Sequence, residues 1–275
     1  MSPLFRRAQP VKPDRPPLHR EIPPPQCPPG WHTGPPDFIG VGTQKSGTSW
    51  WWALLAAHPR VEGSAHAKEL HFLSRFQRRP MGDDDVVEYH RHFPRPPGLL
   101  AGEWTPRYMA IPSVAEAIER AAPEARLLAI LRDPVERYRS GLSQWYVTRR
   151  RTGRSPEDER GESEAIERGL YARQLERLIE RFGRDRVLVL QFERCLSDPA
   201  GQFGRTMSFL GLPEWLPEPE VMKLPVNTTT VDKTDLDPER RRRLVGRYER
   251  DVARVHELVP DLDLTLWPDF RHLSA

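Results

Sequence analysis

Cysteine and lysine are scarce in this sequence, and long apolar runs are missing from it. Two cysteines in 275 residues cannot build a disulfide framework, so we expect Cys27 and Cys195 to be free thiols in a reducing compartment. No apolar run reaches the roughly 18 residues of a membrane-spanning helix, and the N-terminus lacks the apolar centre of a signal peptide. These absences predict a cytoplasmic protein without a membrane span.

The charges are nearly balanced, which removes the usual sign of a nucleic-acid partner. The chain has 42 Lys and Arg against 39 Asp and Glu, for a net charge of +3. Only five of those cations are lysines, at positions 12, 45, 68, 223 and 233. Arginine is the default cation here, so a lysine inside a glycine-containing loop is more informative than usual.

Proline divides the chain into two parts. Residues 1–36 hold twelve of the thirty prolines and show little apolar periodicity, which predicts a flexible, Pro-rich N-terminal tail. Residues 37–275 are then expected to form one folded domain, whose strands and helices alternate. The expected strands are 38–42, 101–105, 126–131 and 186–192, and the expected helices are 48–57, 83–92, 113–122, 134–149, 165–182, 199–210 and 238–258.

This alternation predicts an α/β fold, a three-layer, P-loop-like domain whose central, mainly parallel sheet is flanked by helices. Within it, Ser113 is expected to cap the helix 113–122, and the polar stretch 149–164 is expected to be a loop. The run Arg240–Arg243 is interpreted as a solvated helix face. Ligands of such sheets bind beyond the carboxyl ends of the strands, where residues 42–49 lie.

The stretch FIGVGTQKSGTSW, residues 38–50, has the order of a phosphate-binding loop: strand, small-residue loop, helix. A standard P-loop reads G-x-x-x-x-G-K-S/T. Here Gly42 and Gly47 have the required spacing, but Thr48 stands in the lysine position and the lysine has moved to Lys45. The loop still offers backbone N–H groups and the hydroxyls of Ser46, Thr48 and Ser49. The alternative interpretation is an ordinary Gly-rich turn.

Two motifs resemble sulfotransferases that use 3′-phosphoadenosine 5′-phosphosulfate (PAPS). QKSGTSW resembles their 5′-phosphosulfate loop, and LLAILRDPVERYRSGLS, residues 127–143, resembles their 3′-phosphate element. The resemblance assigns Arg132 and Ser140 to the 3′-phosphate. An Arg fork at a strand end and a hydroxyl on the next helix can converge on one phosphate. Gly169-Leu-Tyr171 is similar to a further nucleotide-side element of the family.

A third stretch, KELHFL at residues 68–73, resembles the E-x-H-F segment of the heparan sulfate (Golgi-type) branch and its bacterial relatives. The resemblance makes Glu69 the catalytic base. His71 is either the alternative base or a group that orients Glu69. EWTPRY, residues 103–108, is similar to the family segment E-K-T-P-x-Y, but Trp104 replaces its lysine. Any contact that this lysine makes to the substrate or the sulfuryl group in the family would have to come from Arg107 or Lys68 here.

Two cofactor contacts are less well defined. The Trp of the family loop stacks on adenine in related cytosolic enzymes, and this matches Trp50; the alternative is that Trp50 belongs to the core. The family also places a basic loop over the cofactor before its last helix, where Lys233 is the candidate.

The resemblance implies transfer of the sulfuryl group of PAPS to a hydroxyl or amine of a small-molecule or carbohydrate acceptor. PAP is the product and no metal is needed. Lys45 would stabilise the leaving group and Glu69 would take the proton from the acceptor. Two alternatives stay open: a P-loop nucleotide kinase or NTPase, and a non-catalytic PAP-binding module.

Overall fold

The computed structural model describes residues 22–63, 68–151, 159–223 and 235–274. Its centre is a five-stranded sheet of order β2-β3-β1-β4-β5, in which all four pairs are parallel. The strands are β1 (Phe38–Gly42), β2 (Val61–Glu62), β3 (Leu100–Trp104), β4 (Arg126–Leu131) and β5 (Val187–Gln191). The predicted parallel sheet is confirmed, and β2 is a strand that the sequence analysis missed.

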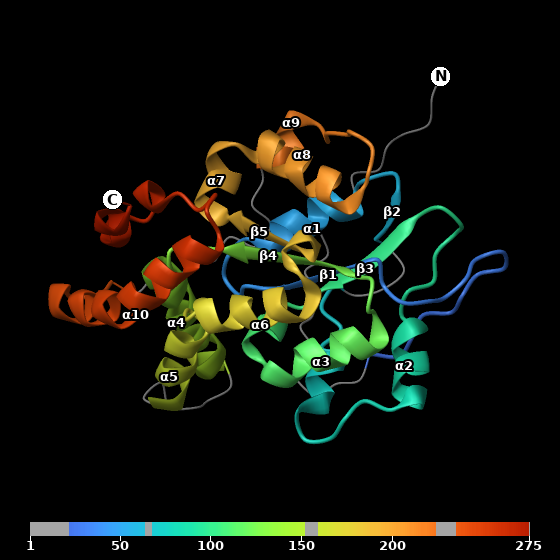
Figure 1. Cartoon of the computed structure of the whole chain (residues 1–275), viewed down its shortest axis with the longest axis horizontal. Coiled ribbons are helices and arrows are strands. Elements are labelled where there is room, and N and C mark those ends of the chain that lie inside the picture. Colours follow the sequence, from blue (N-terminus) through green and yellow to red (C-terminus); the bar gives the residue numbers. More distant parts are fainter. Residues whose placement is uncertain (1–21, 64–67, 152–158, 224–234, 275) are drawn as a thin grey trace.

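Helices cover both faces of the sheet, so the predicted three-layer α/β architecture is also confirmed (Figure 1). Helices α7 and α8 lie on one side, and α3 and α6 lie on the other. The helices are α1 (Thr48–Ala56), α2 (Asp83–His90), α3 (Pro112–Ala121), α4 (Pro134–Arg151), α5 (Glu159–Glu167), α6 (Ala172–Phe182), α7 (Phe192–Ser197), α8 (Pro199–Leu210), α9 (Pro219–Lys223) and α10 (Pro238–Leu258).

Strand β4 shows how the alternation of side chains builds two cores. Leu127, Ala129 and Leu131 join the core that packs against α3, α6 and α10. Leu128 and Ile130 point to the opposite face and join a second core, which contains the three tryptophans of α1. Because both faces are buried, the strand reads in the sequence as an unbroken apolar run.

One predicted helix proves to be two. The expected helix 165–182 is broken between α5 and α6, where Gly169 lies so close to the ring of Tyr248 that a Cβ there would be 2.8 Å from its hydroxyl oxygen. The carboxylate of Asp251 on α10 accepts hydrogen bonds from the N–H groups of Tyr171 (2.7 Å) and Ala172 (3.1 Å) and so starts α6. Helix α5 also occupies part of the predicted loop 149–164.

Two local predictions are wrong for identifiable reasons. Helix α3 begins at Pro112, whose fixed φ suits a first helical position, so Ser113 lies inside the helix rather than capping it. In the run Arg240–Arg243, Arg242 and Arg243 are exposed as predicted, whereas Arg240 and Arg241 are only partly exposed and are held by other elements. Arg240 donates to Tyr138 and Glu162 at 2.8 and 2.9 Å, and Arg241 pairs with Asp269 at 2.6 Å.

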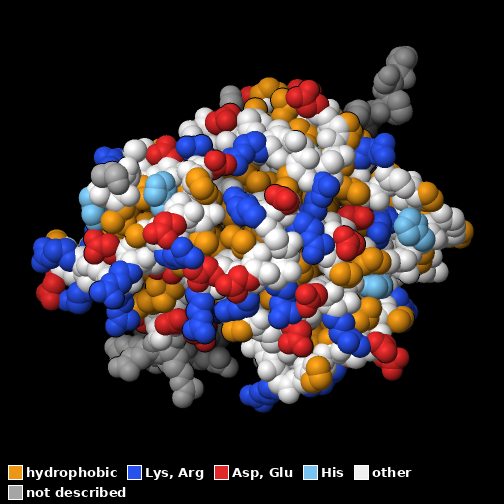
Figure 2. Space-filling model, viewed as in Figure 1, with side chains coloured by type: hydrophobic (Ala, Val, Ile, Leu, Met, Phe, Trp, Pro, Cys, Tyr) orange, Lys and Arg blue, Asp and Glu red, His pale blue; other side chains and the backbone are white. Residues whose placement is uncertain are grey.

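The remaining features concern the surface and the chain before β1. His32 and Arg95 form an isolated antiparallel bridge, so the described part of the Pro-rich segment contacts the domain; its boundary at residue 36 stays a prediction. Both cysteines are free, as expected. The face in Figure 2 mixes cationic and anionic side chains. No helix within the described ranges is long and apolar enough to cross a membrane.

We expect Gly40→Ala to destabilise the protein. A Cβ at Gly40 would overlap the Trp104 ring, and overpacking a buried site lowers the free energy of unfolding by roughly 1–3 kcal/mol. The measurement is urea denaturation.

The matched control is Gly246→Ala in α10, where a Cβ meets no atom within 4 Å. This change should raise the free energy of unfolding by up to about 1 kcal/mol, because alanine is the better helix former. Equal effects of the two substitutions would contradict the packing argument.

Candidate functional site

The loop between β1 and α1 presents the start of a helix to the carboxyl edge of the sheet. Gly47 precedes α1 with φ 77°, a left-handed conformation that favours glycine. Among the described residues no side chain caps this helix start. A helix start that follows a small-residue loop without a side-chain cap is an arrangement that attracts anions.

The loop is fixed by contacts to the neighbouring strand β4. Thr43 Oγ1 donates to the carbonyl of Ile130 at 2.8 Å and lies 2.6 Å from Ser46 Oγ, so the buried Ser46 hydroxyl is engaged inside the loop. Arg132 Nη1 donates to the carbonyl of Lys45 at 2.9 Å. Lys45 itself has φ 73°, an uncommon conformation for a residue with a side chain, and such residues concentrate at functional sites.

A row of three ionisable side chains lies beside the first turn of α1. Lys68 Nζ donates to Thr48 Oγ1 and Ser49 Oγ, both at 3.1 Å, and to Glu69 Oε1 at 3.2 Å. The other carboxylate oxygen, Oε2 of Glu69, lies 3.4 Å from His71 Nε2. The structure thus brings the predicted base next to the predicted anion loop.

The segment that carries Glu69 has no regular secondary structure. His71 has φ 55°, and a 3-10 helix (Phe72–Gln77) follows directly. The side chains of Glu69 and His71 still meet. His71 Nδ1 is buried without a hydrogen-bond partner among the described residues, which fits a tautomer that carries its proton on Nε2, toward Glu69.

A buried carboxylate holds this segment in place. Glu103, at the end of β3, is fully buried and accepts hydrogen bonds from the hydroxyls of Thr105 (2.6 Å), Tyr89 (2.8 Å) and Tyr108 (3.0 Å), and from the N–H of Leu70 (3.3 Å). Burial raises the pKa of Glu103, while these donors lower it in part. The sequence analysis quoted Glu103 but gave it no role.

Two more hydrogen bonds join the same pair of segments. The N–H of His71 donates to Thr105 Oγ1 at 3.3 Å, and the N–H of Leu73 donates to the Tyr108 hydroxyl at 3.2 Å. The backbone around Glu69 is therefore positioned by residues 103–108 rather than by regular secondary structure.

The Trp104 side chain belongs to the core. It is fully buried against Gly40, and its indole N–H donates to the carbonyl of Gly42 at 3.2 Å, beneath the loop. Trp50 is also buried, with 3% of its surface exposed, and its indole N–H donates to the carbonyl of Met222 at 3.1 Å. Adenine stacking by Trp50 stays a prediction.

The second predicted contact region lies at the end of β4. The Arg132 guanidinium packs on the Phe192 ring, 4.9 Å from its centroid; burial lowers the pKa of Arg132 while Glu193 opposes that shift. The Tyr171 hydroxyl donates to the carbonyl of Arg132 at 3.0 Å, and Ser140 lies, largely buried, in the second turn of α4. Lys233 lies outside the described residues.

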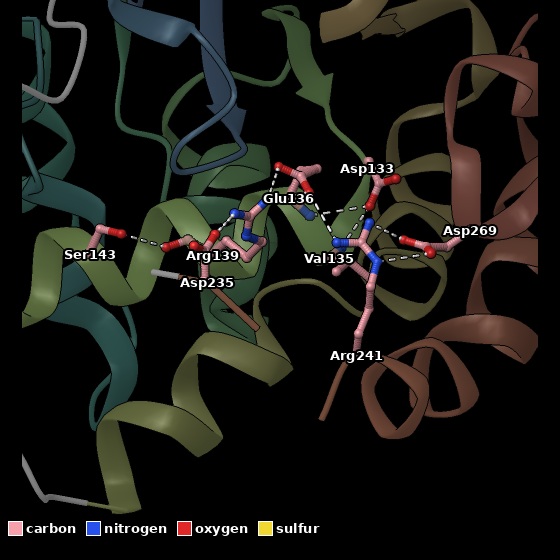
Figure 3. A network of polar contacts seen from close by, with 8 residues as sticks. All are labelled: Asp133, Val135, Glu136, Arg139, Ser143, Asp235, Arg241 and Asp269. Atoms are coloured by element: carbon pink, nitrogen blue, oxygen red, sulfur yellow. Dashed lines mark hydrogen bonds and ion pairs between the residues drawn. The ribbon is translucent and has the colours of Figure 1, made fainter. Parts of the chain in front are cut away.

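Asp133 fixes the turn into α4. Its Oδ1 accepts from the N–H groups of Val135 (2.8 Å) and Glu136 (3.2 Å). Figure 3 shows this cap beside an ion-pair network in which Arg241 bridges Glu136 and Asp269. Asp133 Oδ2 is buried without a hydrogen-bond partner among the described residues, and burial raises the pKa of Asp133 to about 7.

A cavity of about 430 Å³ opens between residues 107–111 and helix α5. It is lined by Arg107, Ala110, Ile111, Ser163, Glu164, Glu167 and Arg168. Its wall begins two residues from Thr105, whose hydroxyl oxygen holds the backbone of His71.

Comparisons with known proteins agree on one family. A sequence model described as the sulfotransferase domain matches residues 35–242. Heparan sulfate glucosamine 3-O-sulfotransferase 6 of Homo sapiens is 31% identical over 188 residues, which cover 64% of this chain and 52% of that protein. For heparan sulfate glucosamine 3-O-sulfotransferase 3B1 of Homo sapiens the identity is also 31%, over 64% and 46%. The chain spans about half the length of these curated relatives.

Solved structures agree with the fold. The crystal structure of a sulfotransferase from Alicyclobacillus acidocaldarius matches with a TM-score of 0.63 and 26% identity, over 85% of this chain and 98% of the other. A sulfotransferase domain from the curacin biosynthetic pathway matches with a TM-score of 0.51 over 72% of this chain and 80% of the other; at 14% identity it supports the fold alone.

We expect Asp133 to make stability fall as the pH rises. Its pKa is about 7 in the folded chain and near 3.8 when exposed, so between those values the unfolded chain has already lost the proton that the folded chain keeps. Above pH 7 this lowers the free energy of unfolding of the wild type by up to about 4 kcal/mol relative to pH 4.

Asp133→Asn tests this expectation, because asparagine keeps the capping oxygen and does not titrate. Urea denaturation of both proteins from pH 4 to pH 8 should show the variant gaining stability relative to the wild type as the pH rises. A stability difference that is independent of pH would mean that Asp133 is ionised in the folded protein throughout this range.

Proposed function

Because this chain belongs to the sulfotransferase domain family, we propose that it transfers the sulfuryl group of PAPS to a hydroxyl or amine of a polar acceptor. The observation that carries this proposal is the position of Glu69. Its carboxylate accepts a hydrogen bond from Lys68, which also donates to Thr48 and Ser49 in the first turn of α1. A base and an anion-binding helix start at one place are what a sulfuryl transfer requires.

The chemistry of the donor groups fits a phosphosulfate. The loop end offers the Lys45 ammonium, the hydroxyls of Thr48 and Ser49, and a helix N-terminus without a side-chain cap. At the end of β4, Arg132 and Ser140 would hold the 3′-phosphate, and Arg132 is already bonded to the Lys45 carbonyl. In the bound state PAPS would supply an activated sulfuryl group whose leaving group is a phosphate.

The side chains divide the work of the transfer. Glu69 would accept the proton of the acceptor while the acceptor atom forms a bond to sulfur. The bond from sulfur to the 5′-phosphate oxygen breaks at the same time, and its electron pair stays on that oxygen. Lys45 and the start of α1 would stabilise this charge. His71, 3.4 Å from Glu69, would orient the carboxylate.

The acceptor would lie in the cavity beside Arg107. Five of its seven lining residues carry polar or charged side chains, and its volume suits a molecule of about monosaccharide size or somewhat larger. The names of the two human relatives indicate an amino sugar within a polysaccharide as their acceptor. We therefore propose a carbohydrate or another polar metabolite as the acceptor. We also propose that the protein is cytoplasmic.

We expect PAP to bind without a metal. The test is calorimetric titration of the purified chain with PAP in the presence of EDTA, and in parallel with ATP plus Mg²⁺. Lys45→Ala and Arg132→Ala should each weaken PAP binding at least about tenfold, because each removes a charged hydrogen-bond donor. ATP–Mg²⁺ binding with no response to PAP would instead favour the nucleotide kinase or NTPase alternative.

We expect Glu69→Gln to reduce transfer of labelled sulfate from PAPS to amino sugars and glycosides by about 10²- to 10⁴-fold, with PAP affinity nearly unchanged. Glu88→Gln is the matched control, because Glu88 is an exposed carboxylate on α2 and should have no effect. PAP binding without transfer to any acceptor by the wild type would favour a non-catalytic PAP-binding module.

A further inference from the structure

Lys68 contacts both the first turn of α1 and the proposed base, Glu69. On one side its Nζ contacts Thr48 and Ser49, in the first turn of α1, where the leaving phosphate would bind. On the other side the same Nζ contacts Glu69, which would remove the acceptor proton. The side chain is 15% exposed, so most of its stem is packed and the position of its ammonium is restricted.

The reaction itself determines what must lie between those two parts. In an in-line displacement, the sulfur atom is placed between the leaving oxygen and the attacking atom. The leaving oxygen belongs at the loop and helix start, and the attacking atom belongs beside Glu69. The three oxygens of the transferred sulfuryl group must therefore pass through the space next to Lys68 Nζ.

We infer that Lys68 is a catalytic residue that contacts the sulfuryl group of PAPS rather than its phosphates. This inference rests on the function proposed above. Lys68 would donate hydrogen bonds to the sulfuryl oxygens and stabilise their negative charge while the sulfur forms its bond to the acceptor atom and loses its bond to the 5′-phosphate oxygen. Lys68 gives up no proton in this step: the acceptor proton goes to Glu69, and the electron pair of the broken bond goes to the 5′-phosphate oxygen.

The position of Lys68 is built into the fold and is not an accident of a surface side chain. Its carbonyl accepts a hydrogen bond from the Trp104 N–H at 2.8 Å, at the end of β3. Two residues later, the N–H of Leu70 donates to the buried Glu103. Two anchors on one strand end thus fix the backbone on both sides of the Lys68–Glu69 pair.

The experiment compares two ligands that differ only in the sulfuryl group, PAP and PAPS, without any acceptor. We expect Lys68→Met to weaken PAPS binding about tenfold or more and to leave the Kd of PAP within about threefold. Lys45→Met is the comparison variant and should weaken both ligands. Lys68→Arg keeps the charge and should recover part of the PAPS affinity.

The outcomes separate this inference from the proposed function. If the wild type binds both ligands and Lys68→Met weakens both equally or neither, Lys68 does not select the sulfuryl group and the inference is overturned alone. If the wild type binds neither ligand, both fail. Thermal unfolding of each variant shows whether it is folded, and Lys68→Arg provides the charge-retaining comparison if Lys68→Met is unstable.

Discussion

The burial of one carboxylate, Glu103, positions the candidate site. A carboxylate taken out of water is costly unless its oxygens are hydrogen-bonded, and here four donors serve them. One of these donors is the Leu70 N–H, so satisfying Glu103 also fixes the backbone between Lys68 and His71. The segment with the reactive side chains has no regular secondary structure of its own. The backbone of this segment is held in place because the buried Glu103 carboxylate needs its N–H group as a hydrogen-bond donor.

The order of the strands explains why the two predicted halves of the cofactor site come together. β1 and β4 are neighbours in the sheet although about 90 residues separate them in the chain. Their carboxyl ends therefore place the Lys45 loop beside Arg132, and the hydrogen bond from Arg132 to the Lys45 carbonyl joins the two segments. Tyr171 extends the same arrangement, because its hydroxyl donates to the Arg132 carbonyl.

Much of this could be predicted from the sequence, because buried parallel strands read as unbroken apolar runs and the motifs mark where they end. Arg126–Leu131 and the loop around Lys45 are such cases. Contacts between distant segments could not be predicted in this way. Nothing in the local sequence around Gly169 reveals that Asp251, far along the chain, starts a helix there. Likewise, only the fold brings Lys68 to the hydroxyls of Thr48 and Ser49.

The contact between Gly40 and Trp104 has a consequence for how this chain can diversify. Trp104 stands where the family pattern has a lysine, and it fills space that exists only because residue 40 has no side chain. A return to lysine would place an ammonium group in an apolar core and leave the volume of an indole ring empty. A larger residue at position 40 destabilises the protein while Trp104 is present. The two positions are therefore coupled: residue 40 must stay small while Trp104 is present, and a smaller residue at position 104 alone would leave a cavity beside Gly40.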